Sequence, residues 1–143
     1  MRVRRSLLTG AVAAATLGLV PAGLALASAH SPSATTIKFV ATQTGQHSTS
    51  KTTFVTTGKD TKGGKLIGYY TLSCKRVSAT VAKCGGAGSF SRGMIYFKFP
   101  LSTKTGTFSG KVIGGTGAYS GATGTITGKP ISKNKEAVTI VIT

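Results

Sequence analysis

Asp60 and Glu136 are the only two acidic side chains in the 143 residues of this sequence. Hydrolysis by the glycosidase mechanism needs two carboxyl groups flanking one bond, and hard cations need several oxygen ligands. The chain also has only 2 His and 2 Cys, so a four-ligand zinc site is not expected. The composition therefore predicts no metal site and no cofactor.

Asp60 lies within a glycine- and lysine-rich stretch, residues 58–64. It is either a turn residue that hydrogen-bonds its own backbone or an acid that faces an internal cavity. Glu136 lies beside the last predicted strand, and we do not expect it to supply a second acid to a site. His47 lies in a polar stretch and is expected to be solvated. The sequence has no G-x-S-x-G motif, so a serine triad built from His47 and Asp60 is not expected.

Residues 1–29 have the pattern of a cleavable signal peptide. Arginines come first, an apolar stretch from Leu7 to Leu26 follows, and the segment ends on the small residues Ala27-Ser28-Ala29. A membrane anchor is the alternative, but Pro21 and the small-residue ending favour cleavage. The arginine pair at positions 4 and 5 fits either twin-arginine or general secretory export. We expect a secreted protein with no membrane span after cleavage, in which residues 30–36 form a flexible lead and 37–143 form one domain.

Cys74 and Cys84 are the only cysteines. An even pair in an exported chain predicts a disulfide. A redox-active or nucleophilic cysteine is the alternative, although the C-x-x-C spacing of redox motifs is missing.

The domain has the composition of a β protein, with no window of helical periodicity and many Thr, Val, Ile and Gly residues. Apolar and polar residues alternate in several segments, as in Phe108, Gly110 and Val112 against Ser109 and Lys111. An all-β, eight-stranded antiparallel barrel or a sandwich accounts for this pattern. The expected strands are Thr36–Gln43, Lys51–Thr57, Lys65–Cys74, Arg76–Cys84, Ser89–Phe99, Gly106–Ile113, Ala122–Lys129 and Ala137–Thr143.

The most specific motif is a glycine-rich stretch at residues 114–124. It is not a dinucleotide-binding loop, because the spacing fails at Ser120 and a strand rather than a helix follows. We expect a tight connection between strands, in which glycines adopt positive φ and Tyr119 closes the barrel end. The residues that define the motif are Gly114, Gly115, Thr116, Gly117, Tyr119, Gly121 and Gly124.

This motif resembles the signature of bacterial allene oxide cyclase-like and dirigent-like barrels. The order of Asp60, Ile67-Gly68, the two cysteines and Gly93-Met94-Ile95 agrees with that resemblance. It implies an eight-stranded barrel with an apolar interior, which often trimerises. Its relatives include plant cyclases of a fatty-acid epoxide and dirigent proteins that steer radical coupling. Asp60 then matches an acidic position implicated as a general acid, whereas Thr123 stands where dirigent proteins often carry Arg.

Two functions follow from these observations. In the first, an open barrel binds an apolar small molecule and acts as a cofactor-free cyclase, an isomerase or a stereocontrol protein. The expected pocket residues are Phe39, Tyr70, Phe97, Phe108 and Ile140. In the second, which the missing Arg and missing second acid favour, a filled, non-catalytic barrel binds anionic cell-wall polymers through its surface charge.

The charge behind the second function is large. Without residues 1–29 the chain keeps 15 basic and 2 acidic residues, a net charge of +13. The lysines are spread along the chain, which is also typical of a solubilising surface. Nucleic acid is not expected as a partner, because only Arg76 and Arg92 remain and no stripe of arginines and aromatic residues could read bases.

Overall fold

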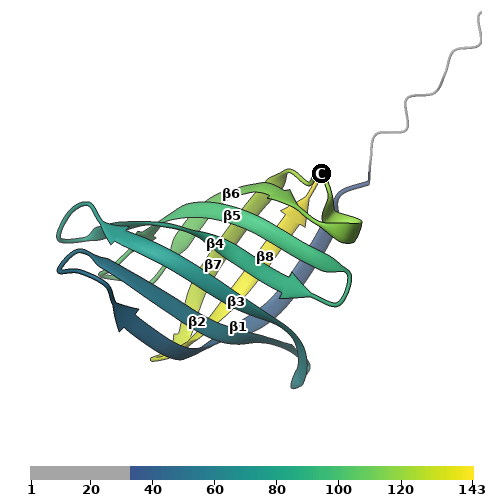
Figure 1. Ribbon diagram of the computed structural model, residues 1–143. Helices are drawn as coiled ribbons and strands as arrows, with labels where there is room; N and C mark the ends of the chain where they lie inside the picture. Colours follow the sequence, from purple (N-terminus) through teal and green to yellow (C-terminus); the bar gives the residue numbers. More distant parts are fainter. Residues whose placement is uncertain (1–32) are drawn as a thin grey trace, which may run out of the picture. The chain divides into compact units, whose positions relative to one another are not determined.

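The computed structural model describes residues 33–143. The predicted signal peptide and residues 30–32 of the predicted lead lie outside the described residues. Eight strands wrap around one interior (Figure 1). They are β1 (Thr35–Ser48), β2 (Thr53–Lys62), β3 (Lys65–Arg76), β4 (Val81–Phe90), β5 (Gly93–Ser102), β6 (Phe108–Gly115), β7 (Gly124–Ser132) and β8 (Lys135–Ile142).

Each strand pairs antiparallel with the next, and β8 pairs with β1 to close the barrel. Thr35 lies opposite Ile142, and Phe39 lies opposite Val138. Closure leaves no unpaired strand edge. The predicted all-β, eight-stranded antiparallel barrel is therefore confirmed. In the part of the chain that the structure describes, no helix is long and apolar enough to cross a membrane.

The core lies inside the barrel, and the alternation of the strands builds it. On β5, Ile95, Phe97 and Phe99 point inward and are buried, whereas Lys98 is exposed. The same alternation places Phe108 and Val112 of β6 inside. Three stacked rings fill much of this side of the barrel: Phe99 lies 4.2 Å from Phe108 and 6.0 Å from Phe97 between ring centroids. One face of each strand therefore supplies the hydrophobic core.

Glycines on the inner face make room for aromatic rings of the neighbouring strand. Gly128 lies opposite Phe108, and a side chain at Gly128 would collide with the Phe108 ring. Gly58 lies opposite Tyr70, and a side chain at Gly58 would collide with the Tyr70 ring. These pairs explain why glycine-containing segments, which resemble turns in sequence, are parts of strands here.

Several predicted strand ends are wrong. The fourth strand was expected to end at Cys84 but continues through three glycines to Phe90. The second strand extends beyond Thr57 to Lys62, so the turn consists only of Gly63 and Gly64, which have φ of 56° and 77°. The first strand extends past Gln43 to Ser48, which places His47 in a strand rather than a loop.

The glycine-rich motif adopts positive φ as expected, at Gly114, Gly117, Gly121 and Gly124. It also contains a short 3-10 helix, Gly117–Tyr119. Tyr119 packs against the core, with its ring edge-on to Phe90 at 6.3 Å.

Cys74 and Cys84 lie directly opposite each other on β3 and β4 and form a buried disulfide, with Cα atoms 4.1 Å apart. The predicted disulfide is thus present. It closes a loop with a sequence separation of 10. We expect reduction to lower the free energy of unfolding by about 2–3 kcal/mol. Without the disulfide, the unfolded chain regains the conformational entropy that closure of a loop of this length removes. Urea unfolding with and without reductant measures the effect, and an unchanged midpoint with fully reduced thiols would contradict it.

Candidate functional site

The barrel interior contains a cavity of about 30 Å³. Three of its lining residues are polar: Asp60, Tyr70 and Glu136. The other lining residues are apolar or glycine, namely Phe39, Ala41, Leu72, Gly88, Phe90, Phe97, Phe99, Phe108, Ile126 and Val138. The cavity is thus an aromatic-lined space in which both acids of the chain come together.

Strand register brings the two acids together. Ala41, in the middle of β1, pairs with Asp60 on β2 and with Glu136 on β8. Directly opposed residues point to the same face of a sheet, so both carboxyl groups face the interior in one row across three strands. Two strand spacings separate their Cα atoms, roughly 10 Å.

Asp60 is the most constrained polar group in the cavity. Its side chain is 1% exposed, and its Oδ1 atom has no hydrogen-bond partner. Burial disfavours the charged carboxylate and raises the pKa of Asp60 from 3.8 to about 7. A carboxyl group with such a pKa can both donate and accept a proton near neutral pH.

Tyr70 and Glu136 complete the polar part of the site, and both are half-buried. Burial raises the pKa of Glu136 above its usual range. Burial is also the main cause of the raised pKa of Tyr70, to which the negative charges of Glu136 and Asp60 add. The Tyr70 hydroxyl therefore keeps its proton and can donate a hydrogen bond to a group in the cavity.

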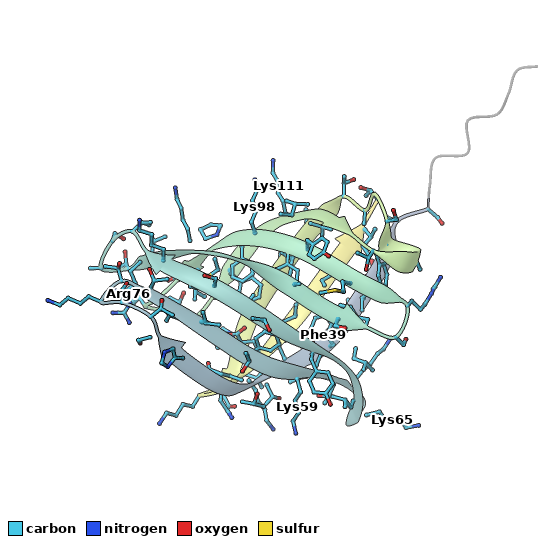
Figure 2. The ribbon with its side chains drawn as sticks, in the orientation of Figure 1. Phe39, Lys59, Lys65, Arg76, Lys98 and Lys111 are labelled. Carbon is cyan, nitrogen blue, oxygen red and sulfur yellow. A yellow bond between two sulfur atoms is a disulfide. The ribbon has the colours of Figure 1, made fainter. Side chains whose placement is uncertain are left out.

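The predicted site residues can now be placed. Phe39, Tyr70, Phe97 and Phe108 line the cavity, and Figure 2 shows Phe39 inside the barrel. Ile140 is fully buried in the core but does not line the cavity.

Of the two interpretations of Asp60, the turn residue is wrong and the acid that faces an internal cavity agrees with the structure. Asp60 lies in β2 and faces inward, and the turn begins after Lys62. The expectation that Glu136 would not contribute an acid is also wrong, because Glu136 lines the cavity. A signal was present in the sequence: Glu136 precedes Val138 and Ile140 at intervals of two, which places all three on one strand face.

The donor set suits proton transfer rather than metal binding. Among residues 33–143, no group of three or more His, Cys, Asp or Glu side chains could hold a metal ion. Two carboxyl groups and a phenol in an apolar space can orient a ligand through hydrogen bonds and move protons to or from it.

The fold defines a class, the small closed β-barrel with an internal site. No protein-family model and no curated protein matches the chain. Among solved structures, the barrel is similar to one described as a pyocyanin demethylase, with a TM-score of 0.66 and 17% identity over 76% of this chain and 100% of that chain. At this identity the similarity establishes the barrel fold and leaves the resemblance to allene oxide cyclase-like and dirigent-like barrels as a hypothesis.

Proposed function

We propose that the protein binds a small, largely apolar molecule in the barrel cavity, and that Asp60 accepts a hydrogen bond from a polar group of that molecule. The observation that carries the proposal is the buried Oδ1 atom of Asp60, which faces the cavity without a partner. A buried acceptor without a hydrogen-bond partner lowers the stability of the fold by about 1–3 kcal/mol, and by more when the group is charged. A bound hydrogen-bond donor would remove that cost.

The lining supports an aromatic or other apolar ligand. Five phenylalanine rings and Tyr70 contribute to it, and such surfaces bind flat, apolar molecules. A solved structure with a similar barrel is described as a pyocyanin demethylase, and this similarity supports an internal site in the present barrel.

The size of the cavity limits how a ligand enters. Its 30 Å³ is far below the roughly 300 Å³ of ordinary ligand pockets. Binding must therefore displace side chains, and Tyr70 and Phe90 are the two aromatic residues of the lining that are half-buried rather than buried. The space already present admits the polar end of the ligand beside Asp60.

If the site is catalytic, its reaction is proton transfer on a confined ligand, as in a cofactor-free isomerase or cyclase. Asp60 would exchange the proton with the ligand, because its pKa of about 7 lies near neutral pH. Tyr70 and Glu136 would orient the ligand. Confinement by the rings would lower the entropic part of the barrier.

Export is part of the proposal. The signal-peptide pattern at residues 1–29 supports it, and so does the disulfide, since such bonds persist mainly outside reducing compartments.

The test is titration with 2-naphthol, a small, flat, fluorescent molecule whose hydroxyl group can donate a hydrogen bond to Asp60. We expect saturable one-site binding that Tyr70→Trp weakens about tenfold or more, because the larger ring fills a cavity of this size. Tyr69→Trp is the matched control: Tyr69 is the neighbouring residue, points outward and is 59% exposed. Binding that survives Tyr70→Trp, or that both variants lose equally, would refute the interior site.

A further inference from the structure

The charges of this protein are segregated between the inside and the outside of the barrel. Asp60 and Glu136 are the only acidic side chains in the chain, and both line the cavity. The outer surface therefore presents lysines and arginines with no acidic side chain among them. Solubilising surfaces usually mix both signs, so this arrangement points to an anionic partner.

The lysines are brought together on β3 to β6. Lys75 lies directly opposite Lys83, and Lys98 lies directly opposite Lys111. Figure 2 shows Lys98 and Lys111 next to each other and projecting away from the barrel. Like charges at directly opposed positions destabilise a sheet. Two such pairs on adjacent strands oppose folding unless anionic groups neutralise them.

A surface hollow lies among these side chains. Lys83, Lys98 and Lys111, from three neighbouring strands, line it, and Pro100, Ser109 and Gly110 contribute to its walls. Its volume is about 430 Å³. The hollow is large enough for an anionic group to enter, and lysines of three strands line it. We refer to it as the lysine hollow.

We propose that the lysine hollow, extended by Lys75, binds a linear phosphodiester polymer that carries no bases, such as an anionic polymer of a cell wall. The Cβ atoms of neighbouring lysines are roughly 5–8 Å apart across the strands, so the lysines form a row along which an extended polyanion can place successive phosphates. Their flexible ammonium groups act as point charges and require no fixed geometry from the anion.

The walls of the hollow favour a polymer without bases over a nucleic acid. Single-stranded nucleic acids are held by stacking of bases on aromatic side chains. Phe99 is the only aromatic residue of the lining, and it is buried beneath the surface, 4% exposed. Charge is therefore the main attraction that the hollow offers.

The test uses poly(glycerol phosphate) as the probe and the purified protein. We expect the triple variant Lys83→Gln/Lys98→Gln/Lys111→Gln to weaken binding about tenfold or more and to reduce the slope of log K against log salt by about 2. The charge-matched control is Lys59→Gln/Lys62→Gln/Lys65→Gln. Figure 2 shows Lys59 and Lys65 on the opposite side of the view from Lys98 and Lys111, and the control should lose less than about threefold.

Equal losses in the two triple variants would overturn the proposal, since net charge alone would then explain binding. Tighter binding of an oligothymidylate with the same number of phosphates would overturn the choice of a polymer without bases. All six lysines are exposed, so both variants should fold, and melting temperatures verify this. Tyr70→Trp should leave polymer binding unchanged, which separates this surface from the interior site.

Discussion

Replacement of Asp60 by Asn is expected to remove a large pH dependence of stability. In the unfolded chain this carboxyl group ionises above its ordinary pKa of 3.8, whereas in the barrel it keeps its proton up to about pH 7. The native state therefore binds more protons between these values, and stability falls as the pH rises through that range. The difference corresponds to about 4 kcal/mol, at about 1.4 kcal/mol for each pKa unit.

Urea unfolding at several pH values from 4 to 8.5 measures this effect. Wild-type protein should lose several kcal/mol over the range, whereas Asp60→Asn should show a much smaller slope. Glu136→Gln is the matched control: burial raises the pKa of Glu136 in the same direction, but its side chain is only half-buried, so its removal should flatten the profile less. A wild-type profile that is flat, or that rises with pH, would contradict the buried, unpartnered state of Asp60.

The second large effect is expected from Gly128→Ala. A Cβ atom at this position would collide with the Phe108 ring, and stacking of that ring on Phe99 at 4.2 Å opposes its displacement. Overpacking of a closed core costs about 1–3 kcal/mol and sometimes more. Gly85→Ala is the control, since its Cβ would meet only the carbonyl oxygen of Phe97 at an ordinary 3.8 Å.

Chemical denaturation of both glycine variants distinguishes the two sites. If Gly128→Ala proves too unstable to purify, the double variant Gly128→Ala/Phe108→Leu should restore part of the stability, because the smaller side chain leaves room for the new methyl group. Equal stability of Gly128→Ala and Gly85→Ala would show that the ring of Phe108 does not rest on Gly128.

The architecture was predictable because alternation depends only on which residues follow each other along a strand. Phe108 and Val112 on β6, which alternate with the exposed Ser109 and Lys111, are an example. Strand ends were harder to predict, because glycines that resemble turns are covered by rings of a neighbouring strand. Gly88, which pairs with Ile95 and lies under Phe90 and Phe97, shows this dependence on register.

The candidate site depends on register even more. Asp60 resembles a turn residue until its pairing with Ala41 places it inside the barrel. Glu136 shares a strand face with Val138, which sequence alone indicates, but its position across Ala41 from Asp60 does not follow from periodicity. The apolar part of the cavity was therefore predicted more completely than its acids.

Pairing between the first and last strands has a consequence for the timing of folding. β1 is the first strand to be synthesised, yet one of its two neighbours, β8, is the last of the eight. Until β8 is available, the barrel stays open and β1 lacks partners along one side. Contacts between such distant segments form late and slowly. The barrel therefore cannot close until all eight strands have been synthesised.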